Sequence, residues 1–484
     1  MKLCIIADIH LPYHKDAPQY RAFDFALDDA KRNKADMLVF AGDITADGCD
    51  EVAEAFYSKV NNCGIPYLVI AGNSDFRSGK NIILPSQTVT ELSDGTTVIM
   101  LEDGCRSLTD NELSALECVR NSDIVIMHHP YIQLKEPWRN EFSEWRKLHK
   151  EIKVFSAHLH RFSVNGNDIS LSALDPDKAI GECPSILYYE TDTGKIERNC
   201  FSCPMPGDFF DKSGISCYKT LEHLKFSAEH KLSCTELRPA SIKCDRGEII
   251  SAIKKWRKSG GKNLSVHFSD AVLRDGKIDG KEKIFSFTDF VHEIGADRIT
   301  VHVPRMTINY STDEIVAMFA EFYGDFINKL PVNCSVGIEN LHMKDSDREN
   351  NTRPFGCVPE ECIDFLQRVR KYTNRKVGIN LDIGHARNNA PYSRKYTLGV
   401  WYAEVGKYCV GYHIHQVFEE KGEYENHTPI AEHYGRLISL ASFYDGISTG
   451  LLADAPKIFE IRTEGGAEKT VEFFENEQST LINN

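Results

Sequence analysis

The stretch KLCIIADIH, residues 2–10, decides how the first part of the chain folds. Its apolar run, Leu3 to Ala7, predicts a buried strand. Asp8 and His10 follow this run, and alternate side chains of an extended backbone lie on the same face. Since carboxylates and imidazoles are common ligands of divalent metals, we expect both side chains to point into one metal site.

The same arrangement recurs outward from this stretch. Further β-rich runs are DMLVFAG (36–42), PYLVIAG (66–72), DIVIMHH (123–129) and KVFSAHLH (153–160). Helix-like stretches, YRAFDFALDDAKRNK (20–34) and EVAEAFYSKVNNC (51–63), lie between the first of them. Strands that alternate with helices predict an α/β layered domain with its sites at strand ends. Periodicity is lost in residues 200–214, which indicates a linker.

A second alternation begins near residue 222. Its strand candidates are KLSCTELR (231–238), NLSVHFSD (263–270), RITVHVPR (298–305), CSVGIEN (334–340), KVGINLDIGHA (376–386), GYHIHQV (411–417) and KIFEIRTEG (457–465). With a less clear eighth strand before residue 450, this pattern over ~260 residues predicts a (β/α)8 barrel. We therefore predict an α/β protein with a layered domain at 1–203, a linker at 204–222 and a TIM barrel at 223–484.

Composition narrows the class of protein. The 484 residues are 42% hydrophobic and 26% charged, and no apolar run reaches the ~18 residues of a membrane span. The first apolar run is interrupted by Asp8 and His10, unlike that of a signal peptide. The fifteen cysteines, an odd number, fit reduced thiols. We expect a cytoplasmic protein with no membrane partner; its oligomeric state is not predicted.

Five short strings place metal-ligand residue types directly after apolar runs. They are Asp8-x-His10, Gly42-Asp43, Gly72-Asn73-Ser74-Asp75, His128-His129-Pro130 and His158-x-His160. A single string of this kind is more often a cap or a satisfied polar residue, but five in order predict a metal site. The two glycines allow tight turns that bring the backbone close to it.

This order of motifs resembles the calcineurin-like metallophosphoesterase family over residues 1–203. The resemblance implies a dinuclear Mn, Fe, Ni or Zn site in which Asp43 bridges the two ions. Asp8, His10 and His160 would bind one ion, and Asn73, His128 and His158 the other. Asp43, Asn73 and His128 would serve catalysis of phosphoester hydrolysis. Ser74 departs from the His usual in the family, so the contribution of that His is lost or is supplied by another residue such as Asp75 or His129; Ala157 replaces the usual Gly.

The predicted barrel also carries ligand types at its strand ends, where the active sites of such barrels lie. Nine residues have this placement: His267, His302, Glu339, Asp382, His385, His413, Glu425, His427 and Glu460. Any one of them alone is at least as often structural. A carboxylate at the end of an apolar strand needs a cation, a proton or a partner, so nine on successive strands indicate metal.

The strings GIEN, LDIGHA, HIHQ, ENH and FEIR resemble those of xylose-isomerase-like TIM barrels, the superfamily of endonuclease IV and the ketose epimerases, over about residues 225–470. An epimerase-like member implies one cation on Glu339, Asp382, His413 and Glu460, with the two Glu residues as acid and base. An endonuclease IV-like member implies three zinc ions. The first would bind His267, His302 and Glu339; the second Glu339, Asp382, His413 and Glu460; the third His385, Glu425 and His427.

Histidines on both the second and third predicted strands favour several Zn or Mn ions over one. Two resemblances then predict a two-domain metallohydrolase that acts on phosphate-containing substrates, either small molecules or nucleic acid. Two alternatives stay open: a phosphatase fused to a sugar or sugar phosphate isomerase or epimerase, and a degenerate first domain that serves as a scaffold. The net charge of −14 weighs against nucleic acid, although bound metals would offset six of the carboxylates.

Overall fold

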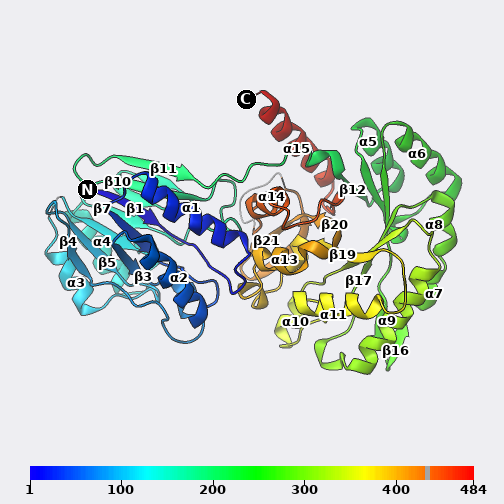
Figure 1. The fold of residues 1–484 in the computed structure, drawn as a ribbon, viewed down its shortest axis with the longest axis horizontal. Coiled ribbons are helices and arrows are strands. Elements are labelled where there is room, and N and C mark those ends of the chain that lie inside the picture. Colours follow the sequence, from blue (N-terminus) through cyan, green and yellow to red (C-terminus); the bar gives the residue numbers. More distant parts are fainter. Residues whose placement is uncertain (121, 431–436, 484) are drawn as a thin grey trace. The chain divides into compact units, whose positions relative to one another are not determined.

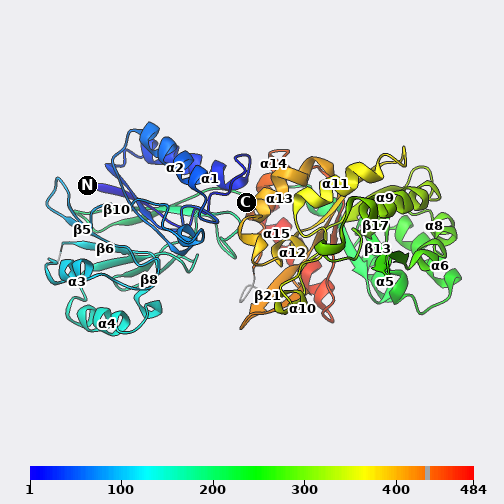
Figure 2. The same cartoon turned by 90° about the horizontal axis from the view of Figure 1, so that it is seen from below.

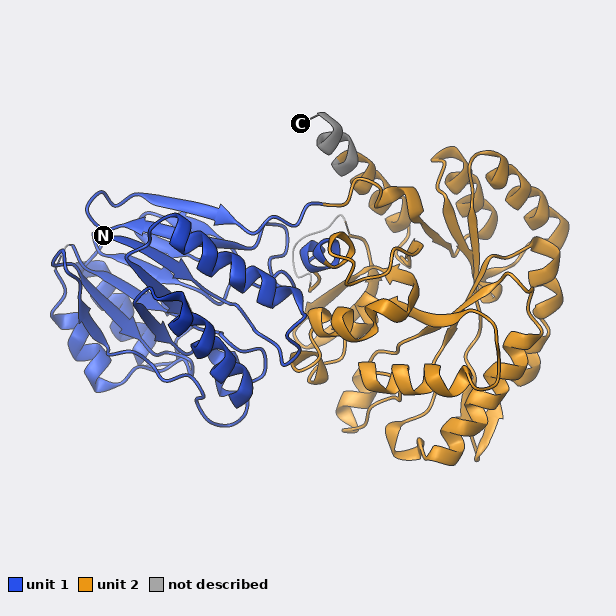
Figure 3. Cartoon of the chain, viewed as in Figure 1, with its two compact units in different colours: residues 1–204, 439–445 blue, residues 205–438, 446–484 orange. Residues whose placement is uncertain are grey.

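The computed structural model describes residues 1–120, 122–430 and 437–483, and it divides into two compact units (Figure 3). The first unit comprises residues 1–204 and 439–445, and the second comprises residues 205–438 and 446–484. None of the helices in the described residues combines the length and the apolarity that crossing a bilayer requires. Each unit has its own sheets and its own metal-ligand residues.

Two sheets form the middle of the first unit. Its strands are β1 (Lys2–Ile6), β2 (Met37–Ala41), β3 (Tyr67–Ile70), β4 (Val89–Glu91), β5 (Thr97–Leu101), β6 (Ile124–Met127), β7 (Lys153–Ser156), β8 (Ser163–Asn165), β9 (Asp168–Ser170), β10 (Ser185–Glu190) and β11 (Ile196–Cys200). One sheet has the order β11-β10-β1-β2-β3 and the other β4-β5-β6-β7-β9-β8. Since β1, β2 and β3 run parallel, as do β5, β6 and β7, the strands of each set end at one edge of their sheet.

Helices cover both outer faces of the paired sheets (Figure 2). Ile5 of β1 packs with Ile126 of β6 in the core between the sheets. On one outer face lie α1 (Pro18–Arg32) and α2 (Asp50–Cys63), which bury Phe23 and Phe56. On the other lie α3 (Asp110–Glu117) and α4 (Trp138–Leu148), which buries Phe142. The predicted layered α/β sandwich is confirmed.

The second unit is a closed barrel of eight strands, all parallel (Figure 1). In barrel order they are β12 (Ser213–Cys217), β13 (Cys234–Leu237), β14 (Asn263–His267), β17 (Arg298–His302), β18 (Ser335–Glu339), β19 (Val377–Asp382), β20 (Cys409–Ile414) and β23 (Lys457–Phe459). The predicted barrel is confirmed: six of its strands lie within the runs that the sequence indicated, and β20 begins two residues before its run.

The eighth strand lies elsewhere than expected. It is β12, inside the stretch 204–222 that was interpreted as a linker, and it pairs with both β13 and β23 to close the barrel. Its sequence, SGISC, is fully buried but contains only two apolar side chains. Where Gly214 lies, a Cβ atom would come within 1.8 Å of the Cys234 carbonyl oxygen, so the small residue permits close strand contact.

The helices of this unit surround the barrel (Figure 1). They are α5 (Thr220–Glu229), α6 (Arg246–Lys258), α7 (Lys281–Phe285), α8 (Thr288–Ile294), α9 (Asp313–Asn328), α10 (Asp345–Glu349), α11 (Pro359–Val369), α12 (Ile383–Arg387), α13 (Leu398–Val405) and α15 (Gly466–Asn483). A further helix, α14 (Ala441–Ser448), begins in the segment 439–445 that belongs to the first unit. In α11 the buried residues Cys362, Phe365, Leu366 and Val369 recur at the spacing of one helix face. Two hairpins, β15 (Val272–Arg274) with β16 (Lys277–Asp279) and β21 (Gln416–Glu420) with β22 (Glu423–Thr428), extend from strand ends.

Candidate metal centres

The ends of five strands bring the predicted ligands of the first unit together. Asp8 and His10 follow β1, Asp43 follows β2, His128 follows β6, and His158 and His160 follow β7, while Asn73 begins a short 3-10 helix after β3. Two groups result, each with ligand atoms within 4.8 Å of one another: Asp8, His10, Asp43 and His160; and His128, His129 and His158. Every predicted ligand of this domain is therefore close to another, Asn73 through His128.

Left-handed backbone positions these side chains. Asp8, His10, Asp43, His158 and His160 have φ values of 51°, 46°, 53°, 67° and 55°. Residues other than glycine rarely adopt this conformation, and clusters of such residues are typical of functional sites. The turns at these strand ends thus hold the side chains close together, and the strained backbone of the turns favours a functional role over a purely structural one.

Two glycines give this cluster room. A Cβ atom at Gly72 would lie 2.3 Å from Asp43 Oδ1, and one at Gly42, where φ is 89°, would lie 2.7 Å from His128 Nδ1. The expected close approach of the backbone at these two glycines is therefore observed.

The contacts of the His128 ring nitrogens show where a cation could bind in the first unit. His128 Nδ1 is 3.0 Å from the Ala41 carbonyl oxygen, which can only accept, so Nδ1 carries the proton. In the neutral ring Nε2 is then an acceptor, and it lies 3.2 Å from Asn73 Oδ1 and 3.5 Å from Asp43 Oδ1. Three acceptor atoms converge here in that neutral form, so either a second proton on the ring or a cation must lie between them. The donor set fits a divalent metal of the Mn, Fe, Ni or Zn type.

Asp43 connects the two groups. Its Oδ2 is 3.1 Å from His10 Nε2, while its Oδ1 accepts the amide N–H of Ser74 at 2.7 Å and faces His128. This arrangement matches the bridging position that the family resemblance implied. On the far side of the His10 ring, Asp175 lies 3.5 Å from Nδ1 and accepts a hydrogen bond from Gln19.

Burial and neighbouring charges shift the acidity of the site. Burial, followed by the charge of Asp43, raises the pKa of Asp8 well above its ordinary value. Burial would also raise the pKa of Asp43, but the facing imidazoles, His128 first, hold it well below its ordinary value. Burial lowers the pKa of His158 to about 3 and that of His160 well below its ordinary value. Both histidines are therefore neutral at neutral pH, which is the form that binds metal.

Asp75 and His129 were expected to supply the contribution of the His that Ser74 replaces, and neither does so as a free positive charge. The Asp75 carboxylate accepts the amide N–H groups of Gly72 at 2.9 Å and Thr45 at 2.8 Å, so it holds the turn together. His129 contributes instead a third imidazole beside His128 and His158, and its buried Nε2 has no hydrogen-bond partner among the described residues. The expectation that Asp75 acts in the reaction is thus not supported by its contacts.

In the barrel, Glu339 is the centre of the ligand residues. It ends β18 and is fully buried, and four imidazoles surround its carboxylate. The distances are 3.3 Å to His267 Nε2, 3.4 Å to His302 Nε2, 3.4 Å to His385 Nδ1 and 3.0 Å to His413 Nδ1. Two of the ligand groups contain Glu339: one adds His267, His413 and Glu460, and the other adds His302 and His385.

Three of these histidines use one ring nitrogen for Glu339 and the other for an acceptor behind the ring. His267 Nδ1 is 3.0 Å from the Phe268 carbonyl oxygen, and His302 Nδ1 is 2.5 Å from Asp270 Oδ1. His413 is reversed: its Nε2 is 3.2 Å from Glu236 and its Nδ1 faces the ligand carboxylates. Metal-binding histidines are oriented in this way, because the outer acceptor fixes the tautomer.

The Glu236 carboxylate, which contacts His413, and the buried Arg298 lie next to this group. Glu236 is fully buried; it accepts hydrogen bonds from Ser265 at 2.8 Å and Thr300 at 3.1 Å, and Arg298 lies 3.8 Å away. Arg298, itself buried, donates to Asn380 at 2.6 Å. The sequence prediction missed Glu236, although a Glu within the strand TEL of β13 is an unusual charge for a barrel interior.

Carboxylates in the barrel stabilise the protonated form of two nearby imidazoles. Although burial lowers it, the Glu339 carboxylate and then Asp270 raise the pKa of His302 to about 9. Glu339 and then Glu236 likewise raise the pKa of His413 well above its ordinary value against the effect of burial. Metal binding here must therefore compete with protons at His302 and His413, whereas in the first unit the proton competes at the Asp8 carboxyl rather than at His158 and His160.

The third barrel group differs from the expected one. It contains Asp382, His385, His415 and His427, whereas the resemblance implied His385, Glu425 and His427. Glu425 is exposed on β22 and belongs to no ligand group of the described residues. His415, which the prediction missed, lies two residues after His413, at the spacing that places strand residues on one face.

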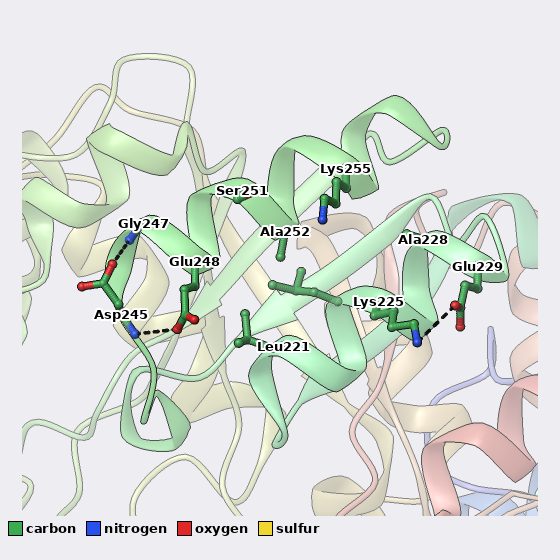
Figure 4. A pocket seen from close by; sticks show the side chains of 11 residues that line it. Leu221, Lys225, Ala228, Glu229, Asp245, Gly247, Glu248, Ser251, Ala252 and Lys255 are labelled. Atoms are coloured by element: carbon green, nitrogen blue, oxygen red, sulfur yellow. Dashed lines mark hydrogen bonds and ion pairs between the residues drawn. The ribbon is translucent and has the colours of Figure 1, made fainter.

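The cavities lie outside these groups. The larger, of about 770 Å³, lies between α5 and α6 and is lined by residues such as Leu221, Lys225 and Glu248 (Figure 4). None of the candidate ligands lines it. A smaller cavity of about 300 Å³ is lined by Arg305, whose Nε donates at 2.9 Å to Asp270, the partner of His302.

Comparison with known proteins gives one family match and several similar solved structures. Residues 1–162 match the family model of calcineurin-like phosphoesterases. Solved structures that are similar include a xylose isomerase domain protein from Planctomyces limnophilus (13% identity, 56% of this chain and 97% of that one, TM-score 0.37). Others are a D-psicose 3-epimerase from Clostridium cellulolyticum H10 (11%, 55% and 98%, 0.40) and a dimetal phosphatase from Danio rerio (11%, 42% and 99%, 0.31). No curated protein matches the chain.

Residues 1–162 therefore form a calcineurin-like metallophosphoesterase domain. A (β/α)8 barrel with clustered metal-ligand residues follows it in the same chain.

Proposed function

We propose that the chain is a two-domain metal-dependent hydrolase of phosphate esters, with a dinuclear site in the first unit and a multinuclear site in the barrel. The observation that carries this proposal is the orientation of His128, whose Nε2 faces only acceptor atoms while its Nδ1 is held by a carbonyl. With His128 neutral, hydrogen bonds within the protein do not satisfy this arrangement, and cations shared by Asp43 would.

In the first unit the residues have distinct tasks. When bound, two divalent cations would polarise the phosphoryl oxygens and lower the pKa of a water molecule enough for it to attack phosphorus near neutral pH. Asp43 faces both ligand groups and would fix the separation of the ions, while the Ser74 amide orients its carboxylate. Asn73 and His128 would hold the second ion beside the phosphoryl group.

In the barrel we propose that Glu339 is shared by two ions, because His267 and His302 approach different oxygens of its carboxylate. Glu460 lies 2.8 Å from His413 and would complete the first of these sites. The substrate would be a phosphodiester or a phosphorylated sugar. The closeness of Glu339 and Glu460 to the one His413 ring also suits a single-cation isomerase or epimerase, in which they serve as acid and base.

Metal content and hydrolysis test the proposal together. We would measure metal per chain after growth with added Mn or Zn, and turnover of bis-p-nitrophenyl phosphate, for the wild type, Asp43→Asn and Glu339→Gln. Asp28→Asn and Glu321→Gln, on exposed faces of α1 and α9, are the matched controls. We expect about five ions per chain, as two in the first unit and three in the barrel, with Asp43→Asn abolishing first-unit hydrolysis.

Other results separate the alternatives. About three ions per chain, with proton exchange between solvent and a carbon next to a carbonyl, would support the epimerase-like barrel. If the wild type does not hydrolyse the diester and Asp43→Asn behaves in the same way, the phosphoesterase is refuted. That result would support a scaffold role for the first unit.

A further inference from the structure

Four buried side chains of the barrel, Asp382, His385, His415 and His427, form a ligand group that does not include Glu339. Their exposed fractions are 0%, 2%, 0% and 2%. Asp382 ends β19, His385 lies in α12, His415 follows β20 and His427 lies in β22. One ligand atom from each lies within 4.8 Å of those of the other three.

Two of the histidines have a ring nitrogen that nothing in the described protein satisfies. His385 Nδ1 is 3.1 Å from the Asn340 carbonyl oxygen, and His427 Nδ1 is 3.1 Å from the Glu460 carbonyl oxygen. A carbonyl oxygen only accepts, so each Nδ1 carries the proton and each Nε2 keeps a lone pair. Both Nε2 atoms are buried without a hydrogen-bond partner, which is costly unless a cation is present.

His415 and Asp382 complete the group. His415 Nε2 lies 3.0 Å from Asp382 Oδ1 and 3.3 Å from Oδ2, and the rings of His415 and His427 are 4.2 Å apart between centroids. Asp382 also accepts the amide N–H of His385 at 2.7 Å, so its carboxylate is fixed relative to that ring. Three imidazoles and a carboxylate are a donor set that suits zinc.

The hairpin geometry explains why Glu425 is left out. In a regular strand Glu425 and His427 would lie on the same face. The register of β21 against β22 shifts between Gln416 and Phe418, and His427 has a φ of 59°, so the alternation is broken next to the site. His427 is consequently buried while Glu425, opposite Phe418, is exposed.

We propose that Asp382, His385, His415 and His427 bind one zinc-type ion of their own, with His415 in the ligand position that Glu425 would otherwise fill. Four protein ligands complete a tetrahedral shell, so this ion has no open position for substrate and serves to tie the β21–β22 hairpin to the barrel. The inference rests on the proposed function only in that the barrel is taken as a metal centre.

The test measures zinc on the full-length chain and needs no activity assay. After removal and replacement of zinc, we expect His415→Ala and His427→Ala each to lose about one ion per chain, and Glu425→Gln to lose none. An unchanged content in His415→Ala, or the loss of one ion in Glu425→Gln, would overturn the assignment. If neither His415→Ala nor Glu339→Gln changes the zinc content, the proposed metal centre of the barrel is refuted together with this site. If Glu339→Gln reduces the zinc content and His415→Ala does not, this site alone is refuted.

A second measurement guards against misfolded variants. His415→Cys keeps a metal ligand at that position, whereas Glu425→Cys places a thiol on the exposed strand. With Co²⁺ in place of zinc, we expect a thiolate-to-cobalt charge-transfer band for His415→Cys and none for Glu425→Cys. The opposite pair of spectra would show that Glu425 is the ligand and would overturn the inference.

Discussion

At the scale of single residues, three histidines of the two units follow one rule. In His128, His267 and His302 a carbonyl or carboxylate oxygen holds one ring nitrogen, and the other nitrogen faces a carboxylate or amide oxygen. The outer partner fixes which nitrogen can bind a metal before any metal arrives. Each such partner is therefore as important to the centre as the ligand that it orients.

Glu236 offers the clearest test of this rule. We expect Glu236→Gln to weaken zinc retention by the barrel about 10- to 100-fold, because Glu236 holds the Nε2 proton of His413 and leaves Nδ1 for the metal. Competition with a chelator of known affinity measures the change, with Glu321→Gln on exposed α9 as the control. Equal retention in the two variants would mean that Glu236 does not act through His413.

The residue types at the site could be predicted from sequence, but their grouping could not. Strings such as Asp8-x-His10 identify ligands because strand periodicity places them on one face. Asp382 was expected beside His413, yet it lies 3.0 Å from His415 and 3.9 Å from His413. Ring orientation and the shifted register of a hairpin decide such differences, and neither leaves a pattern in the sequence.

At the scale of elements, strands were predictable where they are continuously apolar and were missed where they are not. β1 and β19 contain apolar runs, Asp382 ends β19 and Asp8 follows β1, and the sequence indicated both strands. β12 was missed because three of its five residues are Ser or Gly. Its burial comes from tight pairing with two neighbours rather than from apolar side chains, so hydrophobic periodicity cannot detect it.

The turn after β3 should be sensitive to a single methyl group. We expect Gly72→Ala to lower diester hydrolysis about 100-fold, because the new Cβ would displace the Asp43 carboxylate, from which it would be 2.3 Å. Gly64→Ala is the matched control: its φ is 78° and nothing lies near its Cβ position. We expect that variant to lose about 1–2 kcal/mol in free energy of unfolding while turnover is unchanged. Unimpaired hydrolysis in Gly72→Ala would contradict the geometry.

At the scale of the whole molecule, one chain carries two candidate metal centres whose histidines differ in their response to protons. Burial lowers the pKa values of His10, His158 and His160 in the first unit, that of His158 to about 3, whereas carboxylates in the barrel raise the pKa of His302 to about 9. Sequence predicted both centres but not this contrast, since burial and the geometry of charged neighbours determine it.

This contrast predicts the order in which the centres lose metal on acidification. Below pH 9 a proton competes for His302, so barrel affinity falls as pH decreases, while His158 stays unprotonated until about pH 3. During dialysis at stepwise lower pH we expect the ions bound through Glu339 to leave first. Metal analysis of the wild type and of the double variant Glu339→Gln/His415→Ala, which would report the first unit alone, distinguishes the two. Earlier loss from the first unit would contradict the prediction.

Two arginines of the barrel bear on the order of events after synthesis. The buried Arg298 lies 3.8 Å from Glu236, and the partly buried Arg238 lies 2.7 Å from Glu460, so two of the interior carboxylates already have a cationic neighbour from the protein. These cations reduce the mutual repulsion of the carboxylates during folding. We therefore expect the barrel to close before its ions bind, so that removal of the metal leaves the fold in place.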